Sequence, residues 1–141
     1  MQLYSAEILS HVAKPFHNQK IAGATHEIRQ SNALCGDRVH WTLQCSSTHV
    51  VALGQETRGC AICIASASML AEKAYGRART PLLKEIDDFI LEIERIVQGE
   101  ETTKPMAGAF SGVVHAPMRK ECVLLPWQSF QRLFDKKVGE R

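Results

Sequence analysis

The sequence predicts an α+β fold, in which a small antiparallel sheet of two or three strands carries about four helices on one face. Two observations support this prediction. Between residues 38 and 45 apolar and polar side chains alternate, which is typical of a half-buried strand. Later segments repeat their apolar residues at helical spacing, as amphipathic helices do.

The expected elements are separated by recognisable boundary residues. Gly59 breaks the second strand, and Thr80 is the expected N-cap of a helix whose first turn contains Pro81. Pro126 fits the last helix only in its first turn, which favours a start near Cys122. We expect helices at 3–12, 61–75, 81–97 and 122–137, strands at 38–45 and 49–57, a polar surface connection at 15–32 and an irregular stretch at 99–118.

Length and composition limit the class of protein. The 141 residues suffice for one domain, spanning 1–141, and 45% hydrophobic with 23% charged residues exclude a disordered or fibrous chain. A net charge of +2 is too small to indicate a nucleic-acid or anionic membrane partner. The longest apolar stretch has about 12 residues, short of the roughly 20 that a spanning helix needs. Since no signal peptide is recognisable either, we expect a soluble cytoplasmic protein.

The five cysteines are the first indication of chemistry. An odd number of cysteines in a cytoplasmic chain does not fit a disulfide framework. Three roles for the cysteines remain: structural buried thiols, redox chemistry or a metal site. Cys60 and Cys63 form a CxxC at a predicted helix start, as in thioredoxin-like sites. However, the flanking residues lack the aromatic-Cys-Gly-Pro-Cys character of that motif, and no βαβ pattern surrounds the pair.

Three cysteines share a setting that favours the thiolate. Cys35 lies in the turn before the first predicted strand, while Cys60 and Cys122 stand at predicted helix starts, where unpaired N–H groups lower a thiol pKa. Asp37 would bring a carboxylate to the same point as Cys35, because alternate residues of an extended segment share a face. Such donors suit zinc or iron. The spacing matches no local metal motif, so three partly buried thiols remain the alternative.

Three segments of the chain resemble the signature blocks of a known family. They are residues 32–37 (NALCGD), 59–69 (GCAICIASASM) and 117–127 (PMRKECVLLPW). In this order and spacing they are similar to the NifU N-terminal/IscU family of iron–sulfur cluster assembly proteins. Glu121 stands where IscU members carry His, and Ser111-Gly112-Val113 resembles an insertion of SufU members. The chain is therefore more similar to the SufU branch.

This resemblance implies a SufU/IscU-like fold and a specific site. The implied metal ligands are Cys35, Asp37, Cys60 and Cys122, and in SufU-like proteins the metal is usually zinc. Such proteins receive sulfur as a persulfide from a PLP-dependent, SufS-like cysteine desulfurase, and the position of Cys35 is the acceptor. Arg119 is placed to steady the carboxylate or the charge of the persulfide. The implied function is that of a zinc-binding sulfur acceptor or transferase.

Two other functions remain open at this point. A scaffold protein would assemble a [2Fe–2S] cluster, or hold iron, on the same ligands, although the missing His before Cys122 favours the sulfur acceptor. A zinc-stabilised adaptor domain would transfer no sulfur, and its Cys35 would be unreactive even with the desulfurase present.

The remaining candidate residues are expected to be structural. Ala33 replaces the usual proline of the first block, and Cys63 replaces a serine and is expected to be an inert core thiol. Cys45 is expected to be a small buried hydrophobic residue, and Trp127 and Phe130 belong to the predicted core. The six histidines, expected mostly in polar loops or on exposed strand positions and without function, are His11, His17, His26, His40, His49 and His115.

Overall fold

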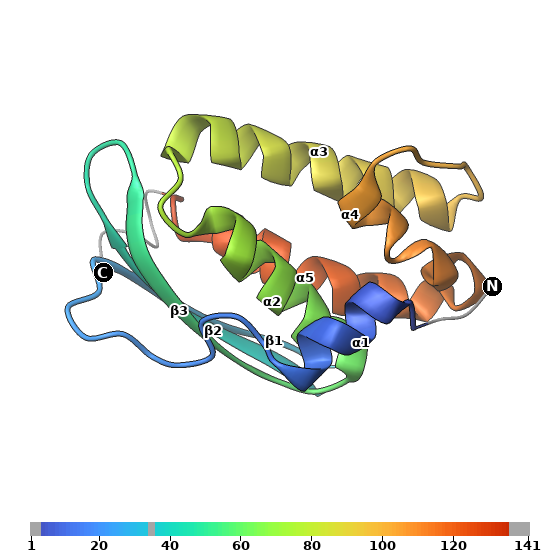
Figure 1. Ribbon diagram of the computed structural model, residues 1–141, viewed down its shortest axis with the longest axis horizontal. Helices are drawn as coiled ribbons and strands as arrows, with labels where there is room; N and C mark the ends of the chain where they lie inside the picture. Colours follow the sequence, from blue (N-terminus) through green and yellow to red (C-terminus); the bar gives the residue numbers. More distant parts are fainter. Residues whose placement is uncertain (1–3, 34–35, 136–141) are drawn as a thin grey trace.

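A three-stranded antiparallel sheet forms one side of the structure, a computed structural model that describes residues 4–33 and 36–135. The strands β1 (His26–Asn32), β2 (Asp37–Cys45) and β3 (Val50–Arg58) follow one another in the sheet in chain order (Figure 1). This confirms the predicted α+β fold. The β2–β3 hairpin differs from its predicted bounds by one residue at most.

Strand β1 corrects the sequence analysis, which expected residues 15–32 to be a polar surface connection. Residues His26–Asn32 pair with β2, and Ile28 lies opposite Trp41. Half-buried and exposed positions alternate along β1, but three of its four inward positions carry polar side chains. The alternation of burial is therefore present without the alternation of hydrophobicity that identifies a strand in a sequence.

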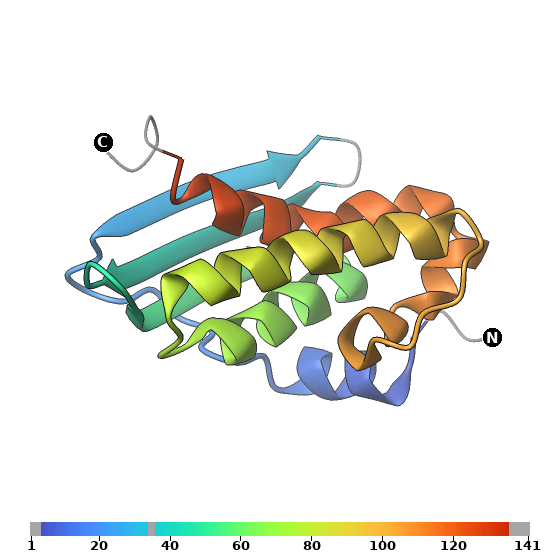
Figure 2. The same ribbon diagram turned by 90° about the horizontal axis from the view of Figure 1, so that it is seen from above.

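The helices lie on one face of the sheet in two layers. Their bounds are α1 (Ala6–Ala13), α2 (Ala61–Ala74), α3 (Arg79–Val97), α4 (Pro105–Gly108) and α5 (Lys120–Arg132). Helices α2 and α5 lie next to the sheet, and α3 covers them on the far side (Figures 1 and 2). The stretch 99–118, expected to be irregular, contains α4 and the 3-10 turns Ser111–His115 and Pro117–Arg119. Within the described residues, no helix combines the length and apolar character needed to span a bilayer.

The start of α3 differs from the prediction by two residues. Its N-cap is Ala78 in an extended conformation, so Thr80 is not the cap, whereas Pro81 does lie in the first turn. Contacts with a distant part of the chain cause this earlier start. Ala78 forms an isolated bridge with His49, and the N–H of Arg79 donates to the carbonyl of Thr48 at 2.8 Å. The β2–β3 turn therefore fixes where α3 begins.

Helix α5 also starts earlier than predicted. It continues directly from the 3-10 turn that ends at Arg119, and it ends at Arg132 rather than at residue 137. Pro126 therefore lies beyond the first turn, contrary to the expectation. Its carbonyl accepts a hydrogen bond from Nε1 of Trp41 at 3.1 Å, which connects α5 to the inner face of β2.

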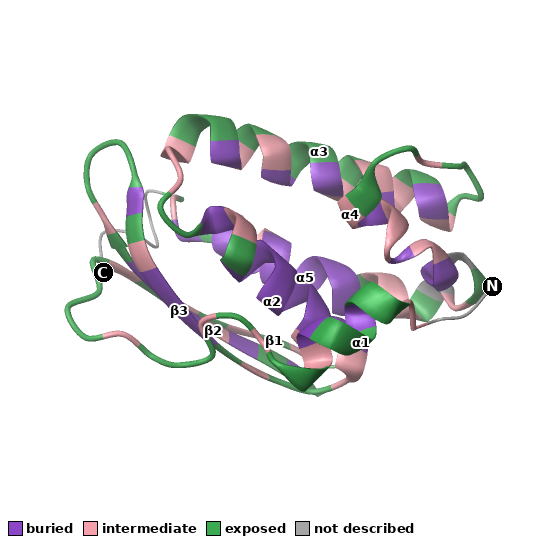
Figure 3. Cartoon of the chain, in the orientation of Figure 1, coloured by how far each residue is buried: buried purple, intermediate pink, exposed green. Residues whose placement is uncertain are grey.

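Helix α2 occupies the centre of the core. It is buried along most of its length, between β3, α1 and α5 (Figure 3). Cys63 is fully buried there, as expected of a core thiol. Trp127 stacks on Phe89 at 3.6 Å between ring centroids, and its Nε1 donates to Oγ of Ser66 at 2.8 Å. The expectation that Trp127 and Phe130 are core residues is confirmed.

His11 does not lie on the surface, where the histidines were expected. It is only 7% exposed, and its Nδ1 lies 2.7 Å from Oγ of Ser68 in α2. The Ser68 oxygen also accepts a hydrogen bond from the N–H of Phe16 at 2.8 Å. Ser68 therefore holds α1 and the loop after it against α2.

Candidate metal centre

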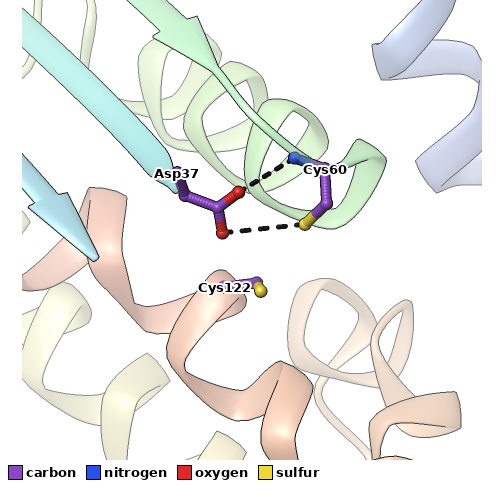
Figure 4. A group of neighbouring side chains, drawn as sticks. All are labelled: Asp37, Cys60 and Cys122. Atoms are coloured by element: carbon purple, nitrogen blue, oxygen red, sulfur yellow. Dashed lines mark hydrogen bonds between the residues drawn. The ribbon is translucent and has the colours of Figure 1, made fainter. Parts of the chain in front are cut away.

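Three of the four predicted metal ligands converge at one end of the sheet (Figure 4). Asp37 is the first residue of β2, Cys60 directly precedes α2, and Cys122 lies in the first turn of α5. Their ligand atoms all lie within 4.8 Å of one another. Asp37 and Cys122 are buried and Cys60 is half-buried, whereas Cys35 lies outside the described residues.

The topology explains this convergence of residues that are far apart in the sequence. In the antiparallel register Arg38 of β2 lies opposite Arg58 of β3. The end of β3 therefore returns the chain to the start of β2, and Cys60 follows two residues later. The 3-10 turn Pro117–Arg119 then brings the start of α5 to the same point.

The Asp37 side chain joins the sheet to helix α2. Its Oδ1 accepts the backbone N–H of Cys60 at 2.9 Å, and its Oδ2 accepts from the Cys60 thiol at 3.7 Å. Cys60 is the N-cap residue of α2 but makes no capping hydrogen bond with its own side chain. Asp37 supplies this function from another element, since a carboxylate at a helix N-terminus satisfies an unpaired N–H and complements the helix dipole.

Gly59 makes this close approach possible. Its φ of +137° lies in a region that side chains rarely adopt, and a Cβ atom there would lie 2.1 Å from Oδ1 of Asp37. From the sequence alone, Gly59 is expected only to end a strand. Its contribution to the site was missed, because the neighbour that requires a glycine comes from another strand.

Arg119 lies at the edge of the same group of side chains. Burial alone would lower the pKa of Arg119, but interactions with Cys60, Cys122 and Tyr4 raise it above the ordinary value. The guanidinium therefore interacts with the Cys60 thiol. Its role in steadying negative charge stays a prediction.

The other cysteines lie apart from this group. Cys63 is one helical turn beyond Cys60, in the core of α2. Cys45 ends β2 at the opposite end of the strand and is half-buried, not fully buried as expected. Burial raises the pKa of the Cys45 thiol, although Arg79 and Thr25 oppose this shift. No histidine within residues 4–33 and 36–135 joins the Asp37 group.

The donor atoms fit a tetrahedral zinc ion. Ligands at about 2.3 Å for sulfur and 2.0–2.2 Å for oxygen, arranged tetrahedrally, lie roughly 3.5–3.8 Å from one another. The ligand atoms of Asp37, Cys60 and Cys122 lie within 4.8 Å of one another, so the three side chains need to move only slightly closer together to hold the ion. Two thiols and a carboxylate are donors for zinc or iron, whereas calcium and magnesium prefer oxygen alone.

Fold and site together define an α+β domain with a thiol and carboxylate centre where the sheet meets two helix starts. A family model described as "NifU-like N terminal domain" matches residues 3–99, which include Asp37 and Cys60 but not Cys122. The chain belongs to this family, as its sequence predicts.

Named relatives extend the similarity over nearly the whole chain. The chain is 26% identical to the iron–sulfur cluster assembly scaffold protein IscU of Streptococcus pyogenes serotype M1, over 97% of this chain and 86% of the relative. It is 27% identical to the zinc-dependent sulfurtransferase SufU of Bacillus subtilis strain 168, over 97% of this chain and 92% of that relative. The crystal structure of FiSufU from Fervidobacterium islandicum AW-1 matches with a TM-score of 0.78 and 26% identity, over 93% of this chain and 96% of that one.

The substitution Gly59→Ala should disrupt the contact between Asp37 and α2. The new Cβ would displace the carboxylate, and the backbone would be strained, so we expect the free energy of unfolding to fall by about 2–5 kcal/mol. Gly76→Ala is the matched control, because its φ is +75° but a Cβ there meets nothing within 4 Å. It should cost only about 1–2 kcal/mol. Urea unfolding followed by circular dichroism measures both, and equal losses would contradict the role given to Gly59.

Proposed function

We propose that this protein is a zinc-binding sulfur acceptor in iron–sulfur cluster assembly, which takes sulfur from the persulfide of a cysteine desulfurase onto Cys35. The observation that carries the proposal is the convergence of the Asp37 carboxylate with the Cys60 and Cys122 thiols. The proposed acceptor, Cys35, precedes Asp37 by two residues in the sequence.

The similarity to named proteins supports a function in iron–sulfur cluster assembly, and one of the names supports sulfur transfer. The Bacillus subtilis relative is named as a zinc-dependent sulfurtransferase, and the Streptococcus pyogenes relative as a cluster assembly scaffold. Cys35, Asp37, Cys60 and Cys122 are the four residues that would hold the ion. When bound, zinc favours the deprotonated form of the thiols that coordinate it.

Sulfur transfer then follows the chemistry of thiol–disulfide exchange. The Cys35 thiolate attacks the terminal sulfur of the desulfurase persulfide and forms a new S–S bond to it. The S–S bond inside the donor persulfide breaks, and the desulfurase cysteine leaves as a thiolate, so no external oxidant or reductant is needed. The Arg119 guanidinium, which interacts with Cys60, would stabilise the negative charge on the new persulfide.

A scaffold function remains the second candidate. Thiolate and carboxylate donors also suit iron, and the Streptococcus pyogenes relative carries the name of a scaffold protein. An adaptor domain stabilised by zinc would have the same site without sulfur transfer. The metal that is bound and the reactivity of Cys35 distinguish the three functions.

The substitution Asp37→Asn should weaken metal retention, while the amide keeps an oxygen that accepts the Cys60 N–H. We expect the zinc affinity to fall by about tenfold or more and Cys35 to be alkylated faster, because one anionic ligand is lost. Zinc per chain after dialysis against a chelator, and iodoacetamide labelling followed by mass spectrometry, measure the two effects. Asp88→Asn, an exposed position on α3, is the control. Unchanged zinc and unchanged labelling would exclude Asp37 as a ligand.

The proposed function as a whole is tested by metal analysis combined with desulfurase turnover. Protein purified without added metal should contain about one zinc per chain. It should raise the turnover of a cysteine desulfurase, and Cys35→Ser should abolish this effect.

The matched control is Cys45→Ser, which replaces a thiol at the opposite end of β2 and should leave the activation unchanged. An anaerobically isolated iron–sulfur chromophore without activation would contradict sulfur transfer and support the scaffold function. Zinc binding with no effect on turnover would support the adaptor function instead.

A further inference from the structure

The sheet face that points away from the helices carries three arginines from three adjacent strands. Arg29 of β1, Arg38 of β2 and Arg58 of β3 are all exposed, and together they line an open hollow of about 670 Å³. Arg38 lies directly opposite Arg58 in the register. Since neighbouring strands are about 4.8 Å apart, the three side chains start from one small area, which we call the arginine face.

The described chain neutralises only one residue of the arginine face, Arg29, which pairs with Glu27 at 3.6 Å. Within residues 4–33 and 36–135, neither Arg38 nor Arg58 forms an ion pair or a side-chain hydrogen bond, although like charges on opposing strand positions destabilise a sheet. The carboxylates of the same sheet face, Glu27 and Glu56, both contact His40 and leave Arg38 and Arg58 unpaired in the part of the chain that the structure describes. The His40 ring contacts Glu27 at 2.5 Å and Glu56 at 3.2 Å.

We propose that the arginine face is a docking surface for an acidic segment of a partner protein. The planar fork of a guanidinium matches a carboxylate with two parallel hydrogen bonds, and such charge-assisted pairs are the stronger ones in proteins. A segment with two neighbouring Asp or Glu side chains has the size and charge that the unpaired Arg38 and Arg58 require. Docking would also remove the repulsion between Arg38 and Arg58.

The surroundings of the arginine face favour a peptide over a nucleic acid. The net charge of the chain is only +2, and Glu27 and Glu56 interrupt the positive surface. Apart from His40, no aromatic side chain points outward from the described strands, so bases would have no stacking platform. An extended phosphate backbone needs a longer positive track than three arginines provide.

The arginine face lies directly behind the candidate metal centre. Arg38 follows Asp37, and because strand side chains alternate, Asp37 points to the helices while Arg38 points away from them. Arg58 likewise precedes Gly59 and Cys60. A partner held at this end of the sheet would therefore lie behind the start of β2, next to Asp37. The inference goes beyond the proposed function and is independent of the metal and of sulfur transfer.

The test measures binding of a fluorescein-labelled hexaglutamate peptide by fluorescence anisotropy at low ionic strength. The wild-type chain should bind it more tightly than a hexaglutamine peptide, and added salt should weaken the binding. In Arg38→Gln/Arg58→Gln the affinity should fall by at least roughly tenfold. This pair removes a repulsion, so it should fold, and circular dichroism verifies this. The control pair is Lys84→Gln/Lys104→Gln, at exposed positions on the helical side, with the same loss of charge.

Three results would overturn the proposal. The first is equal binding of hexaglutamate and hexaglutamine to the wild-type chain. A second is the same loss of affinity in the lysine pair as in the arginine pair, which would indicate a general effect of net charge. The third is an oligonucleotide of equal charge binding as tightly as hexaglutamate or more tightly, which would assign the arginine face to nucleic acid.

Discussion

The contact between the Asp37 carboxylate and the start of α2 is the interaction on which the rest of the site depends. A buried carboxylate is costly unless hydrogen bonds satisfy it, and Asp37 obtains one from the Cys60 backbone at 2.9 Å. The same contact caps a helix that lacks a capping side chain of its own. It fixes the Cys60 thiol relative to the sheet, and Gly59 supplies the space that this geometry needs.

At the end of the sheet where β2 begins, the two faces of the sheet carry different chemical groups. On the helical side, Asp37 and the two thiols form a group of potential metal ligands. On the open side, Arg38 and Arg58 form an unneutralised positive pair. Alternation along β2 places a proposed ligand and a proposed docking residue at consecutive positions. Recognition of a partner and chemistry at the metal would therefore be close in space yet carried by opposite faces.

The sequence predicted those parts of the fold in which hydrophobicity follows burial. The β2–β3 hairpin and the main helices belong to this group, whereas β1 was missed because its inward positions are mostly polar. The convergence of Asp37, Cys60 and Cys122 was expected from helix starts and family resemblance. Gly59 as a space-giving residue and the Arg38–Arg58 pair could not be predicted, because both depend on which residues of β2 and β3 lie opposite one another. Strand register is a tertiary property that local patterns do not determine.

X-ray absorption at the zinc edge is the most direct test of the central claim, that Cys35, Asp37, Cys60 and Cys122 hold one metal ion. It is measured on protein purified without added metal. The account predicts a first shell of three sulfur atoms at about 2.3 Å and one oxygen at about 2.0–2.2 Å. A shell dominated by nitrogen or oxygen, or one with four sulfur atoms and no oxygen, would contradict it.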